Sequence, residues 1–495
     1  MFRLMAVSTL VFLAACDSGG PAPAPTPTPS PTATPSPSPV VFTSPTTASV
    51  AENAMLNYQA TASVGPGLPV GFYISGGADS GAFTITPAGL LNFVTTPDFE
   101  QPADVDRNNS YVVQLTAGDG TRTVTMTLTV QVTNVVEPFN VARIGTGFFR
   151  PMAVVPFYSD YVLVGERSGD IYHLNTRTGA KGRIVSLKPL YNITDTGNGG
   201  LLSMTMRPGS GSELVVLATT NDGLEFFSLN ISLNNFGPLY GGATFPLNGP
   251  LTNIGGWIGY GPDGYLYILT GDGGGPGGAS DLAQDRQSYL GKVLRIQYGS
   301  RLSPWTVNPA PGNPWHTDKS YRSYVYAVGL RNPYRGTFDG DRLIFGDVGE
   351  DALEEINVMP VNQPAMNFGW PFMQGNRPFR GTAPGGLTGP VTQYAHGGGE
   401  REGRMVIGGP VHRGAITALQ GRYVFGDFAS KQIWSVPATS LTPGTLLPSS
   451  SYEMRTTDLR PSVGSIDQII QFGQDVQGNM LIVDYDGDIY RVTGG

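Results

Sequence analysis

The sequence predicts an all-β protein in which a β-sandwich module precedes a six-bladed β-propeller. The 495 residues include 68 glycines and 41 prolines but only 14% charged residues, a composition typical of turn-rich β structure. A unit of two short apolar strands recurs along residues 139–495. Before it, a stretch of about a hundred residues contains segments that alternate polar and apolar positions, as half-buried strands do.

The first 16 residues are expected to be a bacterial lipoprotein signal peptide. Arg3 supplies the positive charge, residues 4–15 form an apolar run too short to span a bilayer, and Leu13-Ala14-Ala15-Cys16 matches the lipoprotein cleavage box. Cys16 is the only cysteine, so its expected role is lipid attachment rather than a disulfide. We therefore expect an exported lipoprotein anchored to a membrane, either periplasmic or at the cell surface.

Two further segments follow the cleavage box. Residues 17–39 are rich in Pro, Thr, Ser and Ala, which predicts an extended tether that cannot bury a core. Residues 40–138 are expected to form the sandwich. Their clearest strand is 123–132, which alternates with period two, and shorter strands are expected at 72–74, 83–85 and 111–115.

The sandwich segment resembles a bacterial cadherin-like (Ig-like) repeat. The resemblance rests on Ala51-Glu52-Asn53, Pro97-Asp98-Phe99-Glu100, Ala117-Gly118-Asp119-Gly120 and Asn134-Val135-Val136-Glu137. It implies Ca²⁺ binding by Glu52, Glu100 and Asp119, because cadherin repeats gather such oxygens around Ca²⁺ where successive repeats meet. Only one repeat is present in this chain, and the same carboxylates are equally compatible with capping turns.

Six copies of the two-strand unit predict six four-stranded blades over residues 139–495. The paired strands are 161–166 with 171–174, 215–218 with 224–227, 266–272 with 293–296, 343–347 with 355–358, 423–427 with 433–436, and 480–484 with 489–492. Five copies carry an acid at the end of the first strand: Glu166, Asp272, Asp347, Asp427 and Asp484. These acids either form an electronegative mouth that suits a cation or accept N–H bonds within their own turns.

The charge balance limits the classes of partner. Thirty Lys plus Arg against 38 Asp plus Glu give a formal charge of −8, which argues against a surface for nucleic acid or anionic lipid. Because the loops on one rim of a propeller converge on its central channel, a ligand site is expected there.

The propeller segment resembles the quinoprotein sugar dehydrogenases of the glucose/sorbosone dehydrogenase family. Seven motifs follow one another in the family's order. They are Gly199-Gly200-Leu201-Leu202, the segment 253–274, Ala283-Gln284-Asp285 with 290–296, Val328-Gly329-Leu330-Arg331-Asn332-Pro333, Gly346-Asp347-Val348-Gly349-Glu350 with 354–357, Asn367-Phe368-Gly369-Trp370-Pro371, and 408–414.

The resemblance implies two cofactors, pyrroloquinoline quinone and Ca²⁺. Arg331 and Asn332 match the family's cofactor-binding pair, and Asn198 stands where the family has a longer Gln or Glu. An arginine fork suits the carboxylates of this quinone. Gly349 and Glu350 match the position whose carbonyl oxygens hold Ca²⁺. An ion pair with a nearby acid is the alternative for Arg331, and an ordinary tight turn is the alternative for Gly349 and Glu350.

The family's catalytic histidine is replaced by Asn253, and an amide cannot act as a general base at neutral pH. Asp272 is the nearest substitute for accepting the sugar's hydroxyl proton, directly or through water. None of the four histidines restores the pattern. We expect His173 to pack within a strand. His412 follows the Gly-Gly-Pro element and could face the channel, and His316 and His396 lie in loops that could overhang the site.

Two functions remain open from the sequence. The first is an exported, lipid-anchored quinoprotein that oxidises an aldose or related sugar and passes electrons to a respiratory acceptor. The alternative is a non-catalytic propeller that binds carbohydrate or protein, with calcium-dependent adhesion through the cadherin-like module.

Overall fold

The computed structural model describes residues 39–64, 69–99, 102–135, 139–247, 251–275, 281–299, 306–315, 317 and 322–494. The chain divides into two compact units, Met1–Asn134 and Val135–Gly495. Cys16, most of the tether, Glu100 and His316 lie outside the described residues. Among the described residues, no helix has the length and hydrophobicity needed to cross a bilayer.

The first unit is built from β-strands around one core. Its sheets are β2 (Thr47–Ala51), β9 (Thr123–Thr133), β8 (Ser110–Gly118) and β5 (Gly71–Gly76); β3 (Tyr58–Gln59), β7 (Leu90–Phe93) and β6 (Phe83–Ile85); and β1 (Val41–Phe42) with β4 (Ala62–Ser63), beside a short 3-10 turn η1 (Ser80–Ala82). The alternation predicted for 123–132 is confirmed, because Met126, Leu128, Val130 and Val132 are buried on one face of β9.

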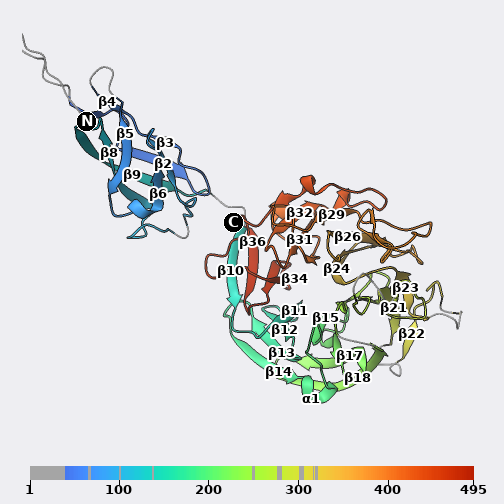
Figure 1. Cartoon of the computed structure of the whole chain (residues 1–495). Coiled ribbons are helices and arrows are strands. Elements are labelled where there is room, and N and C mark those ends of the chain that lie inside the picture. The colour runs from blue at the N-terminus through green and yellow to red at the C-terminus, as the bar shows by residue number, and fades with distance from the viewer. Residues whose placement is uncertain are drawn as a thin grey trace, which may run out of the picture. The chain divides into compact units, whose positions relative to one another are not determined.

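The second unit contains six sheets of four or five strands, which follow one another around a common centre in Figure 1. In spatial order they are β11 (Pro151–Pro156), β12 (Tyr161–Glu166), β13 (Asp170–Asn175), β14 (Lys181–Ser186); β15 (Leu201–Met206), β16 (Glu213–Thr220), β17 (Gly223–Ser232), β18 (Asn235–Phe245); β19 (Gly255–Tyr260), β20 (Leu266–Thr270), β21 (Lys292–Tyr298), β22 (Val307–Pro309), with β23 (Val325–Val328) also on β21; β24 (Pro333–Asp339), β25 (Arg342–Asp347), β26 (Leu353–Pro360), β29 (Thr392–Ala395); β30 (Val406–Ile407), β31 (Arg422–Asp427), β32 (Ile433–Pro437), β33 (Glu453–Met454); and β34 (Ile469–Gln474), β35 (Met480–Asp484), β36 (Ile489–Gly494), β10 (Phe139–Gly145).

Each predicted two-strand copy forms a neighbouring antiparallel pair within its own sheet. The last sheet joins the two ends of the unit, since β10 pairs with β36 and Val141 lies opposite Val492. This pairing closes the circle of sheets with backbone hydrogen bonds. Short elements complete the unit: a hairpin of β27 (Met373–Gln374) and β28 (Arg377–Pro378), helix α1 (Lys188–Tyr191), and the 3-10 turns η3 (Thr417–Leu419), η4 (Ala438–Ser440) and η5 (Ser449–Ser451).

The first strand of five of these sheets contains a β-bulge near its start. The partner strand has one residue fewer at that point, so the extra residue is turned away from the regular pleat. The extra residues are Met152, Leu202, Gly256, Arg335 and Ile470. Because bulges re-aim side chains and carbonyls, the repeated bulge shapes the centre of the unit.

Candidate functional site

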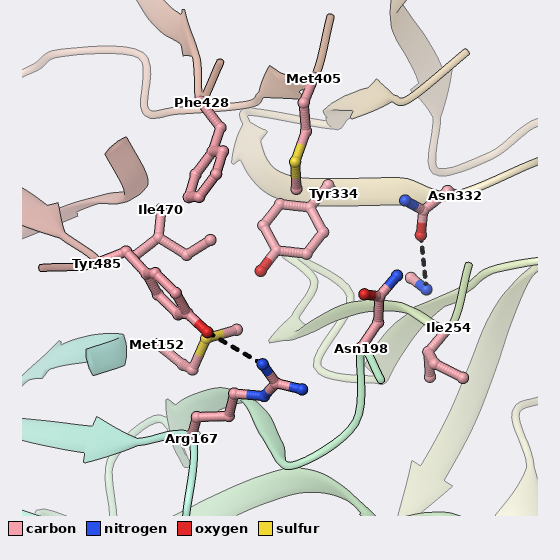
Figure 2. Close-up of a pocket in the computed structure, with 11 residues that line it drawn as sticks. Met152, Arg167, Asn198, Ile254, Asn332, Tyr334, Met405, Phe428, Ile470 and Tyr485 are labelled. Carbon is pink, nitrogen blue, oxygen red and sulfur yellow. Dashed lines mark hydrogen bonds between the residues drawn. The ribbon is translucent and has the colours of Figure 1, made fainter. Parts of the chain in front are cut away.

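A pocket lies at one end of the sheets of the second unit, where the first strand of each sheet begins and its second strand ends. Its lining comes from all six sheets of the second unit or the loops next to them, and consists of Met152, Arg167, Asn198, Ile254, Gly255, Asn332, Tyr334, Met405, Phe428, Ile470 and Tyr485 (Figure 2). The cavity measures about 230 Å³ and opens to solvent. Its volume lies just below the range of about 300–1,000 Å³ that is usual for small-molecule sites, so a ligand larger than the cavity would extend into the open mouth.

Arg167 is the cationic side chain of this lining. It follows β12, and its Nε donates to Gly199 O at 2.7 Å while Nη1 donates to the Tyr485 hydroxyl at 3.0 Å and Nη2 to Gly197 O. All three acceptors are uncharged, and no carboxylate of the described residues forms an ion pair with Arg167. Because the Tyr485 oxygen already accepts from Arg167, its own O–H is free to donate to a ligand.

The amides in the lining are also oriented as donors. Asn332 Oδ1 accepts the backbone N–H of Gly255 at 3.0 Å, which leaves Nδ2 for the pocket. Within the described part of the chain, the side chain of Asn198 makes no hydrogen bond, and Figure 2 shows it directed toward the same space as Arg167 and Tyr334. The polar lining is therefore rich in donors, which suits an anionic ligand.

The aromatic and cationic lining residues were missed by the sequence reasoning, although a signal was present. Arg167, Phe428 and Tyr485 each come directly after one of the strand-end acids. The strand in question is the first of the predicted copy and the second of its sheet. The position after the acid therefore faces the pocket in three sheets. Aligning the repeats and comparing the residue that follows each strand-end acid is the signal that could have identified these side chains.

The strand-end acids themselves do not line the pocket. All five are buried, with at most 4% of each exposed, and each accepts N–H groups of nearby turns. The shortest such bonds join Glu166 to Phe149 N (2.8 Å), Asp272 to Gly274 N (2.8 Å), Asp347 to Asn332 N (2.7 Å), Asp427 to Arg404 N (2.7 Å) and Asp484 to Asp467 N (2.7 Å). The acids hold the rim loops in place, so the hypothesis of an electronegative mouth is wrong for this pocket.

Asn253 and Asp272 are in direct contact beside the pocket. Asn253 Nδ2 donates to Asp272 Oδ1 at 3.2 Å, and Trp370 Nε1 donates to Asp272 Oδ2 at 2.8 Å. Burial raises the pKa of Asp272, although these donors and the Gly274 N–H oppose the shift. Both carboxylate oxygens are occupied and neither residue lines the pocket, so the predicted proton acceptor does not face the ligand space directly.

Arg331 and Asn332 are held by one acid but point to different places. Asp347 accepts the backbone N–H groups of both residues, at 3.0 and 2.7 Å. Only Asn332 lines the pocket. The Arg331 guanidinium pairs with Glu350, with Nη2 2.7 Å from Oε2, which is the ion pair that the sequence left open as the alternative. This arginine does not contact the pocket.

Gly349 follows β25, and its backbone passes close to that of Leu353. A Cβ atom there would lie 1.7 Å from the carbonyl oxygen of Leu353. Within the described residues, the carbonyl oxygens of Gly349 and Glu350 accept no backbone hydrogen bond. They are therefore available to a hard cation, which prefers oxygen ligands.

Glu52 and Asp119, the two described acids among those predicted to bind Ca²⁺, are not brought together. Glu52 accepts the Phe99 N–H at 2.9 Å and donates its own backbone N–H to Thr133 at the end of β9. Asp119 precedes the start of β9 and pairs with Arg122 at 2.6 Å. The length of β9 separates them by about 33 Å, so they cannot share one ion. No group of three or more His, Cys, Asp or Glu residues suited to a metal occurs in the described part of the chain.

The described histidines lie away from the pocket. His412 is fully buried, its Nε2 accepts the Ile416 N–H at 3.2 Å, and burial lowers its pKa, so it is a neutral core residue. His173 packs against Tyr161 in β12, as expected of a histidine within a strand. His396 Nε2 lies 2.6 Å from Glu354 Oε1. None of the three lines the pocket.

Comparison with known proteins points to one family. Residues 148–437 match the sequence profile described as glucose/sorbosone dehydrogenase. Two proteins of Arabidopsis thaliana, the HIPL1 and HIPL2 proteins, are 30% and 31% identical over 270 and 272 residues. Each match covers 48% of this chain and 38% of the plant protein, so the chain spans well under half of these relatives.

Solved structures share the fold of the second unit. The PQQ-bound form of aldose sugar dehydrogenase from Streptomyces coelicolor superposes with a TM-score of 0.54 at 21% identity, covering 72% of this chain and 98% of that one. The soluble aldose sugar dehydrogenase from Escherichia coli, in its apo form, gives a TM-score of 0.56 at 17% identity, with 72% and 100% covered. At these identities the similarity concerns the fold.

Proposed function

The chain belongs to the glucose/sorbosone dehydrogenase family, and we propose that it is an exported oxidoreductase that oxidises a sugar with pyrroloquinoline quinone as cofactor. The observation that carries this proposal is the donor-lined pocket at the centre of the propeller, with an arginine that lacks a carboxylate partner in the described residues. A planar tricarboxylate fits such a site, because Arg167, Tyr485 and the two asparagines supply cationic and neutral donors.

The apolar part of the lining supports a flat ring system. Met152, Ile470, Phe428 and Met405 provide apolar and polarisable surface around the donors. When bound, the quinone would accept the hydride from the sugar carbon. The chain's own part is to orient the cofactor and to exclude water, and the carbonyl oxygens of Gly349 and Glu350 are our candidates for holding Ca²⁺ near it.

Removal of the sugar's hydroxyl proton is expected to limit the rate. The Asn253 amide cannot take the proton, and Asp272 is enclosed by three N–H donors. Loss of a general base typically costs about 10²- to 10⁴-fold in rate. We therefore expect slow turnover with aldoses rather than none.

Reconstitution tests the proposal. The purified protein is mixed with Ca²⁺ and pyrroloquinoline quinone, cofactor binding is measured by titration, and dye reduction is followed with a panel of aldoses. The expected result is micromolar or tighter cofactor binding with slow sugar-dependent dye reduction. Absence of both binding and turnover would overturn the proposal.

A non-catalytic binding propeller is the second candidate. It is favoured by one observation: no lining residue of the pocket can act as a base at neutral pH. Cofactor or sugar binding without any dye reduction, unchanged after a histidine is introduced at position 253, would support this function over the first.

We also propose that the six sheets are the six blades of one propeller and that the first unit is a cadherin-like sandwich. Glu52 and Asp119 then belong to opposite ends of one repeat, where each would need a further partner for Ca²⁺. Calorimetric titration of the full chain with Ca²⁺ tests whether the chain binds the ion, and the absence of any heat of binding would contradict Ca²⁺ binding by the first unit.

Lipid attachment at Cys16 is tested by labelling cells with a radioactive fatty acid, since Cys16→Ala should abolish both label and membrane association.

A further inference from the structure

Arg335 occupies the extra position of the β24 bulge, and its side chain runs to the centre of the propeller. Only 2% of the residue is exposed, and its backbone φ of 64° lies in the left-handed region that side chains rarely adopt. Strained backbone of this kind persists only where the surroundings enforce it, often at functional sites. The bulge and the strain together direct this one arginine inward.

All five N–H groups of the Arg335 guanidinium are used, and four of them reach other sheets. The acceptors are the carbonyl oxygens of Ile470 (2.9 Å), Leu202 (2.8 Å), Gly256 (3.1 Å) and Met152 (2.6 Å), and the Tyr334 hydroxyl (3.4 Å). The four carbonyls belong to the bulge residues of the other four sheets that carry a bulge. One cation thus ties five sheets together at the centre.

This cation has no anionic partner among the described residues. Every acceptor of Arg335 is uncharged, and the group forms no ion pair there. Burial lowers the pKa of Arg335, but an arginine remains charged at any physiological pH. A buried charge is costly unless a counter-charge accompanies it, so the site is incomplete electrostatically.

The pocket is the space next to this charge. Met152 and Ile470, whose carbonyls accept from Arg335, line the pocket with their side chains. Tyr334, which lines the same pocket, has its ring centroid 4.6 Å from the Arg335 guanidinium carbon. In a region of low dielectric, a fixed positive charge acts strongly on charged groups nearby, so this arginine favours an anion in the pocket.

We propose that Arg335 is a positioning residue whose buried charge makes the pocket selective for an anionic ligand, which supplies the missing counter-charge. Arg167 then contacts the anion directly. Arg335 lies behind the lining, separated from the ligand by Tyr334 and the bulge carbonyls, and favours the anion through its charge. The inference rests on the proposed function in its choice of pocket, but it concerns charge selectivity and does not depend on turnover.

The test compares two substitutions that separate charge from hydrogen bonding. Arg335→Lys keeps the positive charge and loses most of the five bonds, whereas Arg335→Met keeps an unbranched side chain and loses both. The control is Arg295→Met, which removes a buried arginine whose charge is already paired with Asp263 at 2.8 Å. Thermal unfolding of each variant reports folding, and titrations report affinity for two probes, pyrroloquinoline quinone and its uncharged trimethyl ester.

Wild type should bind the quinone at least about tenfold more tightly than the ester, a preference that Arg335→Lys should retain and Arg335→Met should lose. Arg295→Met should lower the melting temperature without changing the preference. Equal affinity of wild type for both probes, or equal loss in the Lys and Met variants, would overturn the inference. If Arg335→Met does not fold, the inference is judged from the wild-type preference for the quinone over the ester and from whether Arg335→Lys retains that preference.

A third probe separates this inference from the proposed function. Citrate is a tricarboxylate with no quinone chemistry, and its effect on the melting temperature is measured without Ca²⁺ or quinone. Stabilisation of wild type and Arg335→Lys by millimolar citrate, but not of Arg335→Met, supports charge selectivity even if the quinone neither binds nor turns over. No stabilisation of wild type by citrate, together with no preference for the quinone, refutes it.

Discussion

Replacing Asn253 with histidine is expected to supply the missing base without disturbing the fold. The Asn253 amide already donates to Asp272 Oδ1 at 3.2 Å, so an imidazole at this position can place one ring N–H on the same carboxylate. That hydrogen bond fixes the tautomer and leaves the other ring nitrogen free to accept a proton. The backbone φ of Asn253 is 44°, in the left-handed region where Asn, Asp and His are the side chains most often found.

The expected gain follows from the usual contribution of a general base. A positioned base accelerates a reaction by about 10²- to 10⁴-fold, or about 2.7–5.5 kcal/mol of activation free energy. We expect kcat/KM for the best aldose to rise by about 10²- to 10⁴-fold in Asn253→His. The affinity for pyrroloquinoline quinone should stay within about twofold of the wild-type value. Dye reduction by the protein reconstituted with Ca²⁺ and quinone measures the rate, and titration measures the affinity.

A second variant checks the cause of the gain. Asp272→Asn in the Asn253→His background removes the carboxylate that orients the imidazole, so most of the gain should be lost. Unchanged cofactor affinity with no gain in rate in Asn253→His would refute the reasoning, because it would show that position 253 does not face the reacting hydroxyl. An equal gain in the double variant would refute the role given to Asp272.

Three further changes have expected outcomes. Trp370→Phe removes the N–H donor to Asp272 and should raise that carboxyl's pKa further. The resulting loss of unfolding free energy, about 1.5–3 kcal/mol near pH 7, should shrink as the pH falls and the carboxyl takes up its proton. Gly271→Ala should destabilise by more than about 2 kcal/mol in urea unfolding, since its Cβ would lie 1.9 Å from Asn253 O. Arg167→Gln should weaken quinone binding about 10- to 100-fold in titrations, through loss of the charged donor.

Matched controls accompany these variants. Gly398→Ala adds a methyl group where nothing lies within 4 Å, and it should leave stability unchanged within about 0.5 kcal/mol. Arg167→Lys keeps the charge and should recover part of the quinone affinity. For Trp370→Phe, a loss of stability that is the same at pH 4 and pH 7 would contradict the effect on Asp272, since it would reflect packing against Phe379 alone.

The repeat in the sequence located the strands well. Strand pairs such as 161–166 with 171–174 were predicted from composition and recurrence, and they form because apolar residues at these positions can be buried only between stacked sheets. The motif 328–333 also located one residue of the pocket, Asn332, since the loop before β24 enters the site in a fixed register. Asn198, the other asparagine predicted to bind the cofactor, lines the same pocket.

The site residues were predicted less completely. Arg331 was expected to bind the cofactor, but in the structure it pairs with Glu350, because the turn after β25 brings that carboxylate within 2.7 Å. The position of His412 after the Gly-Gly-Pro element is compatible with facing the channel, but the structure encloses this histidine in the core. Neither outcome could be read from the sequence, since both depend on the path of a loop between sheets.

What the sequence by itself determined is the all-β architecture, through periodicity and recurrence. Its motifs also resemble those of the family, and that resemblance predicts that Asn253 stands in place of the family's base. Periodicity and short motifs are local properties of the chain. Only the tertiary structure decided that five bulges meet around Arg335 and that Arg167 faces the pocket without a carboxylate partner in the described chain. A bulge is a mismatch between two strands, and the partners of Arg335 come from chain segments as far apart as Met152 and Ile470. Their meeting depends on closure of the whole ring of sheets, which no local pattern encodes.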